Sequence, residues 1–413
     1  MVPMMNRVSK LLALEGVERG IWRLLAARSL RGFCDGFIAV LLPVYLLALG
    51  LSKLSVGLIS TSTLLGSAIA TILVGVVGNR YARRSLLIVA AIIMTATGIC
   101  FASFSSLWPL LLVAFISTLN PSGGDVSLFL PIEHACLAES STGHARTTLF
   151  ARYSFLGALS GALGALLAGV PDWIDSRFDV SALSTMRCMF VFYAVAGVAI
   201  AWLYSYMPLQ RASSTAKHAP LGPSRSIVTR LALLFSIDAF AGGLVVNALL
   251  TLWLITRFDL SIGSAGQFFF CTGLLSAGSQ LVAAPLARRI GLLNTMVFTH
   301  IPSSLCLIAA AFAPSLSLTL LMLLIRSALS QLDVPTRSAY VMAVVTPAER
   351  AAAASFTAVP RSLAAAVAPT VAGGLIGFGW VGAPLVACGV LKIAYDLALL
   401  GAFRRVRLSG ENA

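Results

Sequence analysis

Asp35, Asp238 and Arg326 are ionisable residues that lie inside long apolar runs of this sequence. A charged side chain costs about 2.5–3.5 kcal/mol at the centre of a membrane-spanning helix, so such residues usually mark a path for ions or substrates. The carboxylates can take up and release protons, and a guanidinium can bind an anionic group. We therefore predict Asp35 and Asp238 as proton-coupling residues and Arg326 as a substrate-contacting residue.

Each of these residues also has a purely structural explanation. Arg31 precedes Asp35 by one helical turn, so the two could form a local pair that only lowers the cost of insertion. Asp238 has no basic residue within one turn, so its partner must come from another helix. Arg326 could neutralise Asp35 or Asp238, or it could bind an anionic substrate through a bidentate contact.

Other polar residues in apolar runs carry weaker predictions. Lys392 and Asp396 are one turn apart and are expected to neutralise each other. The stretch NPSGGD, which begins at Asn120, interrupts an apolar run with proline and glycine. Asn120 and the freed carbonyl groups could line a cavity, or the interruption could be a kink that serves packing alone. Asn247 is a further candidate for contacting a substrate.

A metal site, a cofactor site and an enzymatic active site are not predicted. Met296 and His300 share a helix face, and the stretch EHAC from Glu133 offers mixed ligands, but no closed ligand set is formed. The chain has only four histidines and no nucleophile elbow.

The composition predicts an integral membrane protein. Of the 413 residues, 58% are hydrophobic and 11% are charged, and the mean hydropathy is +0.93. Soluble domains have about 25% charged residues. Twelve apolar segments are long enough to span a bilayer: 26–50, 55–79, 85–105, 107–131, 146–170, 186–208, 228–255, 263–287, 292–313, 315–345, 350–377 and 380–403. The end of the tenth segment, from Asp333 to Arg337, is expected near the interface.

The basic residues predict the orientation. The 29 Lys and Arg exceed the 15 Asp and Glu, and most of them fall between apolar segments on one side. Cytoplasmic loops collect Lys and Arg, which explains the excess without a nucleic-acid partner. An even number of spans then places both termini in the cytoplasm. We predict a cytoplasmic N-terminal segment (1–25), two six-helix bundles (26–208 and 228–403), a cytoplasmic linker (209–227) and a cytoplasmic tail (404–413).

The two halves share spaced residues, as expected of a duplicated unit. Arg80 corresponds to Arg289, Arg152 to Arg361 and Gly57 to Gly266, and an Asp-Val pair recurs in the fourth and tenth spans. Two parallel repeats of six helices around a central site are a known transporter plan.

The loop after the second span carries a family resemblance. GVVGNRYARR resembles the major facilitator superfamily motif between helices two and three, with the matching residues Gly75, Arg80, Arg83 and Arg84. Asn79 stands where that motif has Asp. The fifth span, with GALSGALGALLAG from Gly157, resembles the glycine-rich helix of the superfamily's drug/proton antiporters, but it lacks their Gly-Pro pair.

This resemblance implies an all-α membrane fold of twelve transmembrane helices in two pseudo-symmetric six-helix bundles. It also implies a cytoplasmic latch that holds the outward-facing state. In this latch, Asp125 is a candidate partner for Arg83 or Arg84, and Asp333 is a candidate partner for Arg289. The alternative is that these arginines only set the orientation.

The predicted function is alternating-access, secondary active transport, most simply proton-coupled efflux of a small organic molecule by a monomer in a bacterial inner membrane. The expected partners are the small-molecule substrate, protons and the lipid bilayer. An importer, or a metal or metalloid ion transporter, is the alternative on the same fold. A membrane-embedded enzyme or a receptor-like protein that does not transport is the alternative of a different class.

Overall fold

The computed structural model describes residues 19–123, 127–139, 143–178, 180–207, 222, 224–346 and 349–404. Within these residues the secondary structure is helical, and nine helices are long and apolar enough to cross a membrane. Most of the predicted linker and of the predicted terminal segments lies outside the described ranges, so these segments remain predictions.

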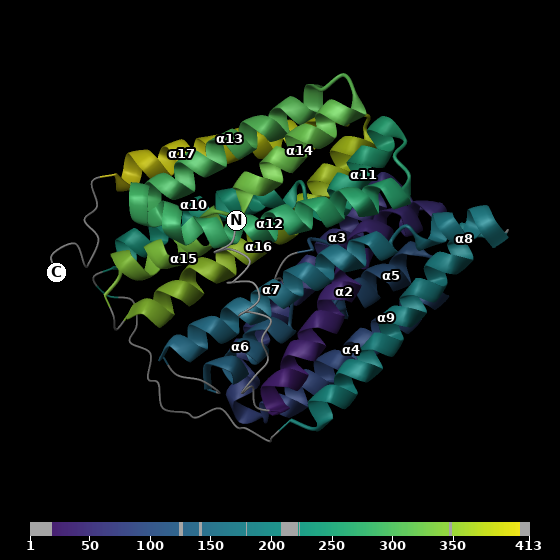
Figure 1. The fold of residues 1–413 in the computed structure, drawn as a ribbon, viewed down its shortest axis with the longest axis horizontal. Helices are drawn as coiled ribbons and strands as arrows, with labels where there is room; N and C mark the ends of the chain where they lie inside the picture. Colours follow the sequence, from purple (N-terminus) through teal and green to yellow (C-terminus); the bar gives the residue numbers. More distant parts are fainter. Residues whose placement is uncertain are drawn as a thin grey trace, which may run out of the picture.

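Two bundles of helices lie side by side, one from each half of the chain (Figure 1). The first contains α2 (Arg19–Ala48), α3 (Lys53–Val77), α4 (Arg83–Ser103), α5 (Leu107–Ile116), α6 (Phe129–Glu139), α7 (Gly143–Leu167), α8 (Val170–Phe178) and α9 (Ala182–Ser205). The second contains α10 (Arg225–Gly243), α11 (Asn247–Phe258), α12 (Ile262–Ile290), α13 (Leu292–Phe312), α14 (Leu316–Ser330), α15 (Asp333–Val344), α16 (Arg350–Gly377) and α17 (Ala383–Phe403). The predicted fold class is confirmed.

Three predicted spans are each built from two helices. The fourth is divided into α5 and α6, as the NPSGGD stretch predicts, and Gly123 there has a φ of +65°. The seventh is divided into α10 and α11, and the tenth into α14 and α15. Breaks inside a bilayer are tolerated where protein or a cavity surrounds the freed backbone groups. The breaks of the fourth and seventh spans meet, because the Ala248 N–H donates to the Pro121 carbonyl at 3.0 Å.

Each bundle has two ends, which we name the linker end and the distal end. The linker end carries Arg19, Met207, Arg225 and Phe403, and the distal end carries the connections 49–52, 259–261, 313–315 and 378–382. In Figure 1 the distal end lies on the right, where α8 projects.

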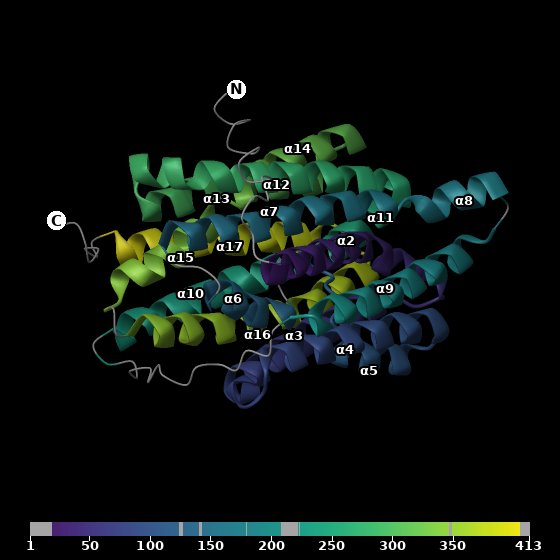
Figure 2. The same ribbon diagram turned by 60° about the horizontal axis from the view of Figure 1, so that its bottom comes forward.

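The two bundles are joined mainly at the distal end. α3 packs along α16, as Figure 2 shows, and α7 packs along α12. The Thr61 hydroxyl accepts from the Thr370 N–H at 3.0 Å, and Asp172 on α8 accepts from the Gly263 N–H at 3.2 Å. Among the described residues, no side-chain hydrogen bond or ion pair joins the bundles at the linker end.

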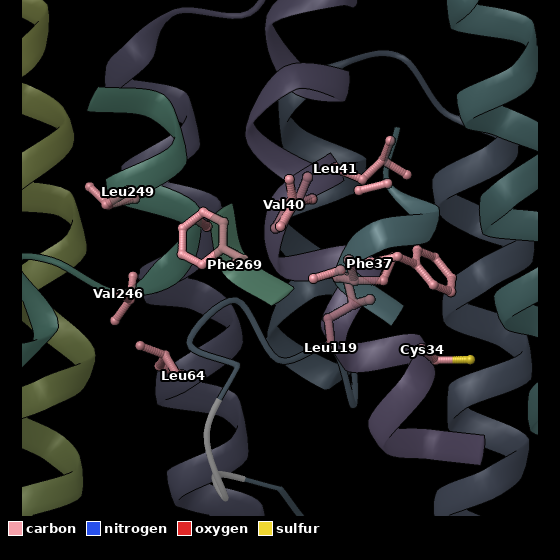
Figure 3. Packing of buried hydrophobic residues seen from close by; sticks show 14 of the residues in the cluster. Cys34, Phe37, Val40, Leu41, Leu64, Leu119, Val246, Leu249 and Phe269 are labelled. Atoms are coloured by element: carbon pink, nitrogen blue, oxygen red, sulfur yellow. The ribbon is translucent and has the colours of Figure 1, made fainter. Parts of the chain in front are cut away.

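The apolar core has two parts. The larger part contains buried side chains from both bundles, including Phe37 and Val40 on α2, Leu249 on α11 and Phe269 on α12 (Figure 3). The smaller part belongs to the linker half of the second bundle alone, where Phe235 packs with its neighbours. The bundles therefore share a core in the middle and at the distal end, but separate cores toward the linker end.

Candidate functional site

A charge cluster is enclosed in the first bundle, and we name it the N cluster. Arg31 on α2 forms an ion pair of 2.5 Å with Glu133 on α6, and both side chains are at most 1% exposed. The hydroxyl of Tyr204 on α9 donates to Glu133 at 2.6 Å, and the hydroxyl of Tyr153 on α7 also donates to Glu133. The Arg31 guanidinium lies over the Phe129 ring at 4.4 Å. Buried charges are tolerated when paired and hydrogen-bonded in this way.

Glycine residues bring α2 and α7 close enough to build the N cluster. A side chain at Gly32 would lie 2.8 Å from the Gly157 carbonyl oxygen, and one at Gly36 would collide with the Gly161 carbonyl. Small residues allow this approach of backbones in membrane helices. The approach carries Tyr153 to the N cluster from α7, and the break of the fourth span sets where α6 presents Glu133.

A second charge cluster lies inside the other bundle, and we name it the C cluster. Asp238 on α10 accepts from Arg337 on α15 at 2.8 Å and from Lys392 on α17 at 2.7 Å. The other Arg337 nitrogen donates to Asp333, one turn earlier on α15, at 2.7 Å. The break of the tenth span matters here, because α15 begins at Asp333.

His300 on α13 extends the C cluster. Its Nδ1 lies 3.0 Å from a carboxylate oxygen of Asp396, and its Nε2 lies 3.1 Å from the Lys392 ammonium. An ammonium only donates, so the hydrogen-bond pattern assigns an acceptor role to Nε2 and a proton to Nδ1. A continuous chain of contacts therefore joins six residues from four helices: Asp396, His300, Lys392, Asp238, Arg337 and Asp333.

Two further arginines of the second bundle form no ion pair with any described residue. Arg326 on α14 is partly buried and lies close enough to the fully buried Cys388 to interact with it electrostatically. Arg361 on α16 is exposed, and its electrostatic neighbours include Arg337 and Asp238.

The predicted pairings of intramembrane charges are partly wrong. Arg31 pairs with Glu133 and not with Asp35, although Asp35 is buried on the same helix. Asp238 does take its partners from other helices, as predicted, but Arg326 is not among them.

Lys392 and Asp396 do not neutralise each other. Lys392 binds Asp238 and Asp396 binds His300, because each of these partners lies on another helix within hydrogen-bond distance.

One of the two predicted latch pairs can be followed in the described residues, and it is not formed. Asp333 binds Arg337, so the pair with Arg289 is not formed, and Arg289 is exposed. Arg80 is exposed in a short 3₁₀ helix (η1, Gly78–Arg80), and a side chain at Gly75 would meet open space.

Arg84 on α4 donates to the Met207 carbonyl at 3.4 Å. Asp125, the predicted partner of Arg83 or Arg84, lies outside the described residues, so that part of the latch remains a prediction.

Asn120 and Asn247 lie at the same junction between the bundles. The Asn120 side-chain oxygen accepts from the N–H and hydroxyl of Ser122, which shapes the break of the fourth span. Asn247 begins α11, and its amide lies against Gly123, where any side chain would collide with it. The junction thus brings together two residues predicted from the sequence.

Two of the candidate metal ligands, Glu133 and His300, bind other residues. Glu133 binds Arg31, and His300 binds Asp396 and Lys392. Across the described part of the chain, no group of three or more His, Cys, Asp or Glu is arranged to hold a metal ion.

Glu133, His300 and Arg337 are central to the clusters, but the sequence did not identify their roles. Glu133 follows the predicted end of the fourth span, and Arg337 was expected at the interface. The available signal was the cost of inserting an ionisable residue into the membrane. This cost singled out Asp238, and it applies equally to Glu133, His300 and Arg337 in or beside their apolar stretches.

The helical fold and its long apolar helices define a multi-pass membrane protein. The model of the Major Facilitator Superfamily matches residues 24–332, which is most of the chain. The protein therefore belongs to the major facilitator superfamily.

Similar proteins cover nearly the whole chain. An uncharacterized membrane protein of Saccharomyces cerevisiae, YJR124C, is 24% identical over 420 residues, which cover 92% of this chain and 93% of the yeast protein. The crystal structure of nucleoside transporter NupG has a TM-score of 0.73 at 15% identity and covers 93% of this chain and 99% of its own. The crystal structure of a D-xylose-proton symporter has a TM-score of 0.72 at 16% identity, with 95% and 99% covered. At these identities the likeness shows the shared fold.

Proposed function

We propose that this protein is a secondary transporter that couples proton movement to the transport of a small organic solute by alternating access. The observation that carries the proposal is the C cluster, in which buried carboxylates are joined to an imidazole through a chain of contacts across four helices. Intramembrane chains of Asp, Glu and His are used as proton relays in transporters. The fold supports proton coupling elsewhere, because one solved structure that shares it is a proton symporter.

Asp238 is the proposed coupling residue. Its two carboxylate oxygens bind Arg337 and Lys392, which belong to different helices. A proton on Asp238 removes the charge that holds both, and therefore changes the relative stability of two arrangements of α10, α15 and α17. A proton shifts the conformational equilibrium only by its differential affinity for the two states.

The proposed orientation places the linker end in the cytoplasm, following the distribution of basic residues. The structure then corresponds to an inward-facing state, since contacts between the bundles concentrate at the distal end. Transport requires the distal contacts of Thr61 and Asp172 to break while the linker end closes. A bacterial inner membrane and a monomeric state remain predictions from the sequence.

The main argument for export as the direction of transport no longer holds. The glycines of the fifth span favoured export, but Gly157, Gly161 and Gly164 are accounted for by the close packing of α7 against α2. We therefore propose proton coupling without preferring export over import, and the test below measures both.

The test uses purified protein in liposomes that contain a pH-sensitive dye. Sugars, nucleosides, organic acids and amines are added singly, first outside and then trapped inside. We expect one class to change the internal pH. Asp238→Asn should lower the rate of this response by roughly 100-fold or more, as expected for loss of a proton-transfer group.

Asp175→Asn is the matched control, because it removes an exposed carboxylate of α8. It should leave the response unchanged. Solute movement without any pH change, or a wild-type response from Asp238→Asn, would contradict the proposal.

A further inference from the structure

The second bundle contains more positive charge than its carboxylates neutralise. The C cluster and the two arginines near it comprise four cationic residues and three carboxylates: Arg326, Arg337, Arg361 and Lys392, and Asp238, Asp333 and Asp396. Every carboxylate already has a partner, since Asp238 and Asp333 bind Arg337 and Asp396 binds His300. No described carboxylate is left for the other two arginines.

Arg326 is held inside the bundle and not at its lipid face. The wholly buried Cys388 of α17 is its electrostatic neighbour. Its backbone is fixed, because the Ser303 hydroxyl of α13 donates to the Arg326 carbonyl at 3.3 Å and the Ser276 hydroxyl of α12 donates to the next carbonyl at 3.5 Å. Arg326 lies well inside the predicted tenth span, 315–345, so a lipid headgroup is not expected to reach it.

The guanidinium of Arg326 has no described acceptor of its own. No hydrogen bond from its side chain and no ion pair is found among the described residues. The end of α14, one turn later, supplies only the partial negative charge of a helix C-terminus. A charged group in this position is expensive unless something pairs with it for part of the transport cycle.

We infer that the transported solute carries an anionic group, a carboxylate or a phosphate, and that Arg326 binds this group. The inference rests on the proposed function. A guanidinium presents two parallel N–H donors that match both kinds of anion. Arg361, exposed in the linker half of α16, adds positive charge toward the linker end. The C cluster, beside this site, then takes the proton.

The experiment compares pairs of solutes that share a scaffold and differ in charge: nicotinate and nicotinamide, glucuronate and glucose, and uridine monophosphate and uridine. Uptake and internal pH are measured together in liposomes containing the wild type, Arg326→Gln, Arg326→Lys or Arg177→Gln. Arg177 is an exposed arginine of α8 and provides the matched control.

The expected result is transport of the anionic member of at least one pair and not of its neutral twin. Arg326→Gln should raise the KM for that anion by roughly 10- to 100-fold, the value of a hydrogen-bonded charge pair. Arg326→Lys should be intermediate, because an ammonium does not bind an anion through a planar fork. Arg177→Gln should match the wild type.

Two results would overturn the inference. One is transport of a neutral twin with the same KM as the anion. This includes the case in which Arg326→Gln impairs transport of both solutes equally because Arg326 pairs with Asp35 in another state of the cycle. The other is an unchanged KM for the anion in Arg326→Gln. In either case, the proposed function is not contradicted as long as a solute changes the internal pH. If no solute of either charge changes the internal pH, the proposed function itself has failed.

Discussion

The N cluster and the C cluster are built on corresponding helices of the two bundles, with the charges reversed. The first helix of each half contributes Arg31 in one and Asp238 in the other. The second part of the fourth helix contributes Glu133 in one and Arg337 in the other. Corresponding helices of the two bundles therefore carry ion pairs of opposite polarity.

The surroundings of the two pairs differ more than the pairs themselves. In the N cluster, two tyrosines and an aromatic ring enclose a single pair, and the partners are at most 1% exposed. In the C cluster, the pair continues into Lys392, His300 and Asp396, and the Lys392 side chain is 13% exposed. We therefore expect the N cluster to hold its bundle together and the C cluster to serve the proposed proton coupling.

The largest effect is expected from breaking the N cluster. Glu133→Gln leaves the buried Arg31 without a counter-charge, and removing one member of a buried pair costs about 3–5 kcal/mol. The free energy of unfolding in detergent, measured by denaturant titration, should fall by this amount.

A second variant separates structure from transport. Arg31→Met combined with Glu133→Gln removes both charges and keeps an amide oxygen for the tyrosine hydroxyls. It should recover most of the stability and still transport. A stable double variant that does not transport would show that the N cluster also takes part in the cycle.

A smaller loss of stability is expected from Asp238→Asn. Arg337 keeps Asp333, and Lys392 keeps His300, so each cation retains a partner. The free energy of unfolding should fall by about 1–3 kcal/mol, the cost of hydrogen bonds to a charged group. The same titration as for Glu133→Gln measures it. A loss as large as that of Glu133→Gln would mean that the C cluster is as structural as its counterpart.

His300→Gln should change transport with little change in stability. The glutamine amide can donate to Asp396 and its oxygen can accept from Lys392, but an amide does not relay protons. The transport rate should therefore fall several-fold. Initial rates in liposomes provide the measurement. A wild-type rate would remove His300 from the proposed relay.

The smallest effect is expected from Glu349, a carboxylate of the same bundle outside the membrane-spanning segments. Hydrogen bonds from Ser224, Thr346 and the Gly222 N–H lower the pKa of Glu349 to about 2 from its ordinary value of 4.5. Because the folded-state pKa is depressed, the stabilisation is present above about pH 4.5 and is lost as the pH falls toward 2.

Glu349→Gln should therefore transport at the wild-type rate. Its thermal stability in detergent should lie slightly below that of the wild type at pH 7, and the two should converge as the pH approaches 2. A large loss of transport would show that carboxylates of the second bundle matter irrespective of the C cluster.

The sequence by itself determined the class of protein and most of its helices. The apolar fraction and the low charge content require a bilayer, because a soluble fold cannot hide so much apolar surface. The motif of Gly75, Arg80, Arg83 and Arg84 indicated the superfamily, and the family match confirms it. The stretch NPSGGD predicted the break of the fourth span, since proline and glycine disrupt a helix locally.

The tertiary structure alone decided which charges meet. Helical spacing allowed a local pair of Arg31 with Asp35 and predicted one of Lys392 with Asp396, yet the pairs observed for Arg31, Lys392 and Asp396 cross from helix to helix. The reason is physical: inside a membrane a buried charge binds whichever partner offers the best geometry and desolvation, and helix packing sets that geometry. The small residues that let α2 approach α7 are visible in the sequence, but the tyrosine that this approach brings to Glu133 is visible only in the fold.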